Sequence, residues 1–209
     1  MLTKIKERIQ FLLVSEAKLF HSIGLTPDHL SMLGVLFAFA SATMYWISRY
    51  YESALLVASI FLLISGFFDA VDGVLARQFG EVTVFGGFLD SLFDRYADAF
   101  VFLGIIIGLL LTDPVWVFWG FAAMIGALLV SYSRARAEAE EVKMESVGIA
   151  ERAERIIILV VATLLNIVWT EALRWSMPLL AFLTNLTVLQ RALYFKKASR
   201  KKMPAKLVV

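Results

Sequence analysis

The sequence contains no cysteine, and charged residues make up only 18% of its 209 positions. The absence of cysteine excludes disulfides, thiolate nucleophiles and cysteine-based metal sites. Soluble domains contain about 25% charged and about 45–50% apolar residues, whereas 60% of this chain is hydrophobic. So few polar groups cannot cover the surface of a soluble domain. The composition therefore predicts a membrane protein, and it excludes a disordered chain or a basic arm that binds nucleic acid.

Apolar stretches alternate with polar breaks along the chain and predict an all-α integral membrane protein with six transmembrane helices. The stretches lie at residues 30–49, 53–68, 96–111, 114–133, 156–170 and 175–195. A helix needs about 20 residues to cross about 30 Å of hydrocarbon. The second and third spans must therefore include, at their inner ends, the polar sequence between Asp69 and Asp94.

The distribution of basic residues predicts the orientation of these spans. With six spans, all Lys and Arg residues except Arg49 and Arg174 fall on the side of the two termini. The positive-inside rule makes that side cytoplasmic. All five tryptophans lie near the opposite ends of the spans, as expected for an aromatic belt at the interface. We expect a multi-pass protein of the cell membrane whose polar inner region faces the cytoplasm.

The chain reads as a single membrane domain over residues 1–209. Residues 1–25 alternate apolar and charged residues at near-helical spacing, which predicts an amphipathic helix on the cytoplasmic surface. Thr26 is the expected N-cap of the first span, with Pro27 in its first turn. Residues 26–195 form the predicted six-helix bundle, and residues 196–209 a basic cytoplasmic tail near anionic headgroups.

Four aspartates at the inner ends of the second and third spans are the most informative residues. In helical geometry Asp69 and Asp72 share one face, as do Asp90 and Asp94. An ionised side chain in this position costs about 2.5–3.5 kcal/mol, so four of them require a compensating cation. If the two faces oppose each other, their oxygens suit Mg²⁺ or Mn²⁺. Two such ions beside a groove would suit chemistry at a phosphate.

The aspartates allow two other interpretations. Pairing with Arg77 and Arg95 would leave two of the four carboxylates without a counter-charge. A cation or proton transporter is a functional alternative, because acids within membrane segments mark ion pathways. The third span, however, has no charged residue from Ala99 to Leu111, so no pathway to the outside is visible.

The aspartates belong to a longer pattern, Asp69-x2-Asp72-Gly73-x2-Ala76-Arg77-x8-Gly86-x3-Asp90-x3-Asp94. This pattern resembles the complete motif of the CDP-alcohol phosphotransferases, membrane enzymes of phospholipid synthesis that usually form homodimers. The resemblance implies that Asp69, Asp72 and Asp90, with Asp94 near them, hold two divalent ions, Mg²⁺ or Mn²⁺. It makes Asp94 the general base. The residues implied for the cytidine diphosphate site are Asp28, Asp72, Gly73, Ala76, Arg77 and Gly86.

A basic region between residues 131 and 155 bears on the acceptor of the transferred group. Arginines form bidentate contacts with phosphates, but here they could equally pair with Glu138, Glu151 and Glu154. The region resembles the phosphatidylinositol phosphate synthases of actinobacteria and their archaeal relatives. That resemblance implies that Arg134, Arg155 and Arg191 bind the phosphate of inositol 1-phosphate.

The resemblance therefore predicts a metal-dependent enzyme. It would transfer a lipid phosphatidyl-type group from CDP-archaeol or CDP-diacylglycerol to inositol 1-phosphate and release CMP. One alternative keeps the reaction but uses glycerol 3-phosphate or an amino alcohol as acceptor. The other alternative is the transporter. The expected partners are the CDP-linked lipid, the water-soluble inositol phosphate, membrane lipid and a second copy of the chain.

Overall fold

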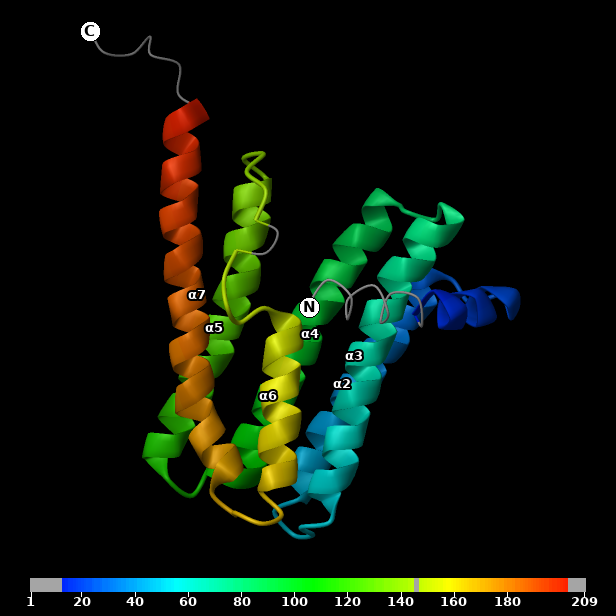
Figure 1. Ribbon diagram of the computed structural model, residues 1–209. Coiled ribbons are helices and arrows are strands. Elements are labelled where there is room, and N and C mark those ends of the chain that lie inside the picture. The colour runs from blue at the N-terminus through cyan, green and yellow to red at the C-terminus, as the bar shows by residue number, and fades with distance from the viewer. Residues whose placement is uncertain (1–12, 145–146, 203–209) are drawn as a thin grey trace, which may run out of the picture. The chain divides into compact units, whose positions relative to one another are not determined.

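The computed structural model describes residues 13–144 and 147–202, and in these ranges it contains helices and no strand (Figure 1). A first helix covers residues 13–22. The others are α2 (Pro27–Ile47), α3 (Ala54–Phe79), α4 (Val84–Ile105), the π-helical segment η1 (Ile106–Leu110), α5 (Pro114–Glu138), α6 (Arg152–Leu165) and α7 (Ala172–Lys202). The first residues of the predicted surface helix, 1–12, and the end of the predicted tail, 203–209, lie outside the described residues. The chain divides into two compact units, Met1–Gly104 and Ile105–Val209.

The start of α2 confirms the expected cap. Thr26 has extended backbone angles, its hydroxyl accepts from the His29 backbone N–H, and Pro27 occupies the first turn. The Nδ1 atom of His29 in turn accepts from the Thr26 backbone N–H at 3.3 Å, which completes a capping box. The capping box therefore gives His29 a structural role at the helix terminus.

Helix α3 continues well beyond its apolar stretch, as the length argument requires. Its 26 residues include Asp69 and Asp72, and it ends at Phe79. Gly80 follows in the left-handed conformation, with φ of 70°. Glycine adopts this conformation at a lower energy than residues that carry a Cβ. A short turn then leads into α4, so the acidic parts of α3 and α4 are joined by only four residues, 80–83.

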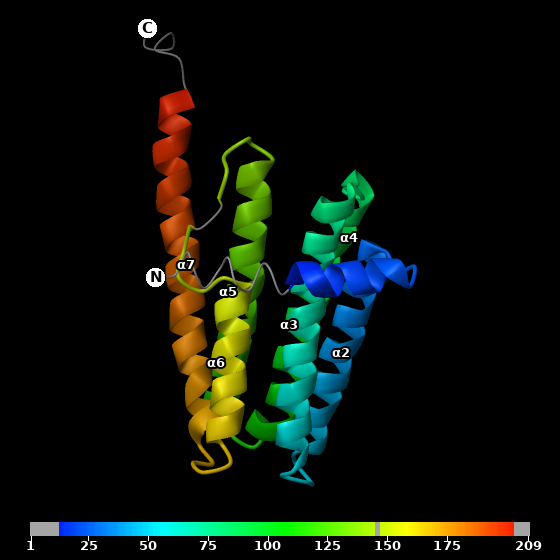
Figure 2. The same cartoon turned by 45° about the vertical axis from the view of Figure 1, so that its right-hand side comes forward.

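Close approaches between backbones hold the helices of the first unit together. Helices α2 and α3 lie side by side (Figures 1 and 2), and the Ser41 hydroxyl donates to the Ala58 carbonyl at 2.8 Å. A Cβ added to Gly104 of α4 would lie 2.4 Å from the Ala42 carbonyl oxygen of α2. Gly104 therefore serves contact between helices of the same chain, where only a hydrogen fits.

The helix over residues 13–22 lies across the ends of α2 and α3 (Figure 2). Ala17 is fully buried and shares a hydrophobic cluster with Leu30, Val71 and Leu75. Phe20 of the same helix contacts the ring of Phe68 at a centroid distance of 5.9 Å. These contacts fix the helix to the first unit, at the end where α3 turns into α4.

Four helical segments in the described residues are long and apolar enough to cross a membrane. They are α2, α3, α5 and Ala172–Ser199 of α7, with 21, 26, 25 and 28 residues. Large apolar side chains on them are exposed, for example Leu36, Phe39 and Leu63, each about half accessible. Such side chains are stable in hydrocarbon. Helix α6 has 14 residues, about 21 Å at 1.5 Å per residue, which is shorter than its predicted span.

The second unit is built around α7, which packs against both α5 and α6. Helix α5 begins at Pro114 and is capped by the Asp113 carboxylate, which accepts from the Val115 backbone N–H at 2.9 Å. Gly126 of α5 is pressed against α7, where an added Cβ would lie 2.1 Å from the Thr184 hydroxyl. The second half of α7 also lies next to the connection from α5 to α6, where the Thr187 hydroxyl accepts from the Ile149 and Ala150 backbone N–H groups.

Candidate functional site

Three of the four predicted metal ligands come together in the first unit. Asp69 and Asp72 of α3 and Asp90 of α4 each have a carboxylate oxygen within 4.8 Å of the other two. Asp72 is 5% exposed, and the other two are half-buried. Three hard oxygen donors at this spacing fit Mg²⁺ or Mn²⁺. Asp94 lies one helical turn beyond Asp90 on α4 and is not one of these three.

A serine that the sequence argument did not select orients one of these carboxylates. The Ser31 hydroxyl of α2 donates to Oδ2 of Asp72 at 2.5 Å and lies 3.2 Å from the Pro27 carbonyl oxygen. Ser31 and Asp72 are both buried. Hydrogen bonds to ligand carboxylates fix their direction and are as important to metal sites as the ligands. Ser31 therefore belongs to the site through its contact with Asp72.

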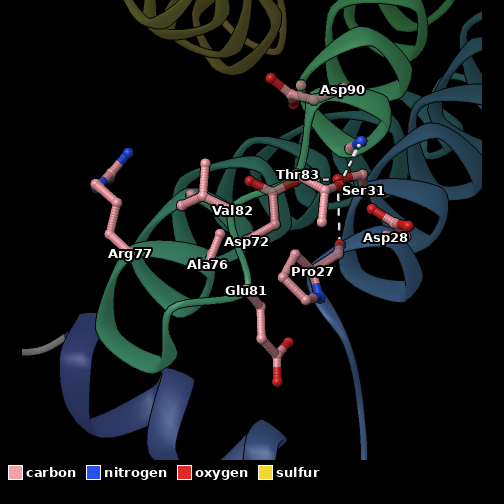
Figure 3. Close-up of a pocket in the computed structure, with 13 residues that line it drawn as sticks. Pro27, Asp28, Ser31, Asp72, Ala76, Arg77, Glu81, Val82, Thr83 and Asp90 are labelled. Carbon is pink, nitrogen blue, oxygen red and sulfur yellow. Dashed lines mark hydrogen bonds between the residues drawn. The ribbon is translucent and has the colours of Figure 1, made fainter.

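A cavity of about 290 Å³ lies beside the acidic cluster (Figure 3). All six residues that the resemblance implies for the nucleotide site line it, together with Asp90. Sequence reasoning missed its other lining residues, Pro27, Ser31, Glu81, Val82, Thr83 and Gly87. Contributions come from the start of α2, the second half of α3, the turn after it and the start of α4.

Two glycines keep the cavity open at defined places. A Cβ on Gly73 would lie 3.2 Å from a guanidinium nitrogen of Arg77, so this arginine folds back over the glycine. A Cβ on Gly86 would lie 2.9 Å from the Thr83 hydroxyl and 3.1 Å from Oδ1 of Asp28. Gly86 thus allows α2 and α4 to approach closely enough for Asp28 to face the cavity. A side chain at either position would take up space beside the cavity.

The turn between α3 and α4 forms one wall of the cavity and is itself ordered by hydrogen bonds. The Glu81 backbone N–H donates to the Ala76 carbonyl at 2.9 Å. The Thr83 hydroxyl accepts from the Gly86 backbone N–H at 2.9 Å, and the Thr83 carbonyl accepts from the Gly87 N–H. Thr83 therefore caps the start of α4. A threonine just before a helix is a recognisable start signal, and it could have been used to find this wall.

The three predicted acceptor residues lie in the second unit. Arg155 and Arg191 are each 2% exposed, and Arg134 is exposed. Arg191 Nε donates to the Val147 carbonyl at 2.8 Å, and its other nitrogens to the Val130 carbonyl and to Glu151 at 2.5 and 3.1 Å. Arg134 and Arg155 both lie close enough to Arg191 for their positive charges to interact with it. The structure thus brings the three together as a cluster of positive charge.

The same arginines organise the segment that precedes α6. Arg155 donates to the Ala150 carbonyl at 3.1 Å, and the Thr187 hydroxyl accepts from the backbone N–H groups of Ile149 and Ala150. Gly148 has φ of 119°, and a Cβ there would lie 2.3 Å from the methyl group of Thr187. Residues 147–151 are therefore fixed to α7 through backbone contacts. Arg134 instead pairs with Glu138, one turn along α5, at 2.9 Å.

Comparison with known proteins agrees with this geometry. Residues 24–194 match the model of the CDP-alcohol phosphatidyltransferase family, and the chain belongs to that family. An archaetidylinositol phosphate synthase of Pyrococcus horikoshii is 38% identical over 197 residues, which cover 94% of this chain and 97% of the relative. A phosphatidylinositol phosphate synthase of Mycobacterium tuberculosis is 33% identical over 176 residues, 81% of this chain and 78% of the relative.

Solved structures lead to the same class. A crystal structure of the Mycobacterium tuberculosis phosphatidylinositol phosphate synthase with bound CDP-DAG has a TM-score of 0.77 and 28% identity, covering 94% of this chain and 97% of that one. A second structure of that enzyme contains manganese and citrate. The chain is therefore a transferase of phospholipid biosynthesis that uses divalent metal ions. Membership of a transferase family decides against the transporter alternative.

Proposed function

We propose that the protein transfers a lipid phosphatidyl-type group from a CDP-linked lipid, CDP-archaeol or CDP-diacylglycerol, to inositol 1-phosphate and releases CMP. The observation that carries this proposal is the cavity of the first unit. Six residues implied for a cytidine diphosphate line it, and three carboxylates within 4.8 Å of one another adjoin it. The names of the relatives support the choice of inositol phosphate as acceptor.

In the proposed reaction, Asp94 accepts the proton of the acceptor hydroxyl. The hydroxyl oxygen forms a new bond to the lipid-linked phosphorus, and the bond from that phosphorus to the bridging oxygen of the diphosphate breaks, so CMP leaves with the bond electrons. Divalent ions held by Asp69, Asp72 and Asp90 would supply positive charge beside the diphosphate. Ser31 keeps the Asp72 carboxylate directed toward this position through its 2.5 Å hydrogen bond. The protein's main contribution is orientation of the two substrates.

The nucleotide would be bound by the cavity wall. Arg77 offers a guanidinium to the diphosphate, and Gly73 and Gly86 allow the ligand to approach the backbone. Asp28 faces the same space from the first turn of α2 and would accept hydrogen bonds from the nucleoside. Ala76 has a side chain small enough to leave the cavity free above α3.

The phosphate of the acceptor would be attracted by Arg134, Arg155 and Arg191. Arg134 is exposed and pairs with Glu138, and an exposed ion pair of this kind contributes only about 0–1 kcal/mol. Arg155 and Arg191 are buried, and they would act through their charge and by shaping residues 147–151. An amino alcohol carries no phosphate and would not need three guanidinium groups, which favours a phosphorylated acceptor.

We further propose that the single membrane domain has six spans, with an amphipathic surface helix before them and a basic tail after them. In the described residues four helices already satisfy length and hydropathy. Leu19 and Ile23, near the end of the helix over 13–22, are 57% and 66% exposed, as suits a helix at a lipid surface. The acidic cavity would face the cytoplasm at the cell membrane, and the protein would act as a homodimer.

The test is an assay of CMP release by the purified protein with Mg²⁺ or Mn²⁺ and CDP-archaeol or CDP-diacylglycerol. We expect release that depends on inositol 1-phosphate. CMP release that depends instead on glycerol 3-phosphate or an amino alcohol would change the proposed acceptor but keep the proposed type of reaction. Absence of CMP release with every acceptor and both lipids would overturn the proposal. Asp94→Asn should abolish turnover and leave binding of the CDP-linked lipid intact, because only the proton acceptor is lost.

A further inference from the structure

A histidine of the first helix contacts the turn that forms one wall of the cavity. The ring of His21 lies 3.7 Å from the ring of Phe79, centroid to centroid, with the two planes 13° apart. Its Nδ1 atom lies 3.5 Å from Oε1 of Glu81. His21 therefore contacts the last residue of α3 and a residue of the turn at the same time, with a left-handed glycine, Gly80, between them.

The histidine is presented from a fixed support. The helix over residues 13–22 is anchored by the buried Ala17 and by the contact of Phe20 with Phe68. Its last turn is closed by hydrogen bonds from the backbone N–H groups of Gly24 and Leu25 to the His21 and Phe20 carbonyls, at 3.0 and 3.1 Å. The backbone of His21 is thus held directly before the cap of α2. Because its backbone is held in place, the His21 ring can fix the position of a neighbouring segment.

The partner is the turn over residues 80–83. Backbone hydrogen bonds shape it, but Val82 is 68% exposed, and Phe79, the residue before the turn, is 36% exposed. Glu81, Val82 and Thr83 all line the cavity. In Figure 3 the side chain of Glu81 extends toward the dark blue ribbon of the first helix. The stack on His21 and the contact between His21 and Glu81 tie this wall to the first helix.

We propose that His21 is a positioning residue for the reaction, which holds the wall over residues 79–83 at the distance from α2 that the CDP-linked lipid requires. This inference rests on the proposed function of the cavity. The side chains of His21 and Glu81 are 40% and 33% exposed. A polar contact as exposed as this contributes little to folding stability. Its effect is on the position of the wall, and hence on the affinity for the nucleotide.

The experiment measures the KM of each substrate separately for His21→Ala. We expect the KM for the CDP-linked lipid to rise about tenfold, as loss of the aromatic contact with Phe79 and of the contact with Glu81 implies. The KM for inositol 1-phosphate and kcat at saturating CDP-linked lipid should stay within about twofold, because the catalytic groups do not move. His21→Phe keeps the stack and should recover part of the affinity. Lys18→Gln, an exposed position on the same helix, should match the wild type.

A merely structural role would give a different pattern. Lower stability reduces the amount of active enzyme and lowers the apparent kcat while both KM values stay unchanged. That result, or an equal rise of both KM values, would overturn the proposal. Binding of CDP in the presence of Mn²⁺, measured by calorimetry, gives a readout apart from turnover, and it should weaken in parallel with the KM. A wild type that releases no CMP would instead refute the proposed function, so the two failures are distinct.

Coupling between the two sides of the contact gives a second test. If His21 acts through the turn, His21→Ala and Phe79→Ala should each weaken CDP binding, and the double variant should be little weaker than either one. Additive losses would show that the two residues act separately and would overturn the inference.

Discussion

Removing the Ser31 hydroxyl tests how the metal site is held. The hydroxyl donates to Oδ2 of Asp72 at 2.5 Å, and both residues are buried. A hydrogen bond to a charged group contributes about 1.5–3 kcal/mol. Because about 1.4 kcal/mol corresponds to a factor of ten, Ser31→Ala should weaken Mn²⁺ binding about 10-fold to 100-fold. Ser31→Thr keeps a hydroxyl at the position and should restore most of the affinity.

The assay is a Mn²⁺ titration followed both by CMP release and by direct binding to the purified protein. Ser41→Ala is a matched control, because Ser41 is also a buried serine of α2 that donates to α3, but its acceptor is the Ala58 backbone carbonyl. We expect a shifted Mn²⁺ dependence for Ser31→Ala and an unshifted one for Ser41→Ala. Equal Mn²⁺ affinities of wild type and Ser31→Ala would refute this expectation, as would equal shifts for the two serine variants.

Three further predictions follow from packing. Gly86→Ala should raise the KM for the CDP-linked lipid about tenfold, because its Cβ would lie 3.1 Å or less from two cavity oxygens. An unchanged KM would contradict this. Gly104→Ala should lower the free energy of unfolding by about 1–3 kcal/mol, seen as a lower Tm in detergent; an unchanged Tm would refute the close contact with α2. Thr187→Val releases the anchor of residues 147–151 without removing a charge. If Arg191 acts only by holding that segment, Thr187→Val and Arg191→Ala should raise the KM for inositol 1-phosphate alike. If its charge also attracts the acceptor phosphate, as we expect, Arg191→Ala should have clearly the larger effect.

Much of the first unit follows from local sequence. The start of α2 is predictable because a threonine followed by a proline is a helix-start signal, and the structure confirms both positions. The passage of α3 through its polar end follows from length, and Gly80 is a recognisable stop. The pairing of two acidic helix faces also follows from periodicity, and the structure brings Asp69, Asp72 and Asp90 within 4.8 Å.

Contacts between segments distant in the chain could not be predicted in this way. Ser31 and Asp72 are 41 residues apart, and their contact depends on how α2 packs against α3. The stack of His21 on Phe79 likewise depends on where the first helix lies. Charge alone could not show that Arg191 would be buried and hydrogen-bonded to two backbone carbonyls. The sequence alone does not distinguish an arginine that hydrogen-bonds to a neighbouring backbone segment from one that binds a ligand's phosphate.

The central claim is that Asp69, Asp72 and Asp90 together hold the divalent ions that assist transfer from the CDP-linked lipid. Anomalous diffraction at the manganese edge, from crystals grown with Mn²⁺ and CDP, tests it most directly. We expect anomalous peaks bounded by these three carboxylates and adjoining the cavity that Asp28 and Arg77 line. Manganese bound elsewhere, with the three carboxylates directed to other partners, would contradict it.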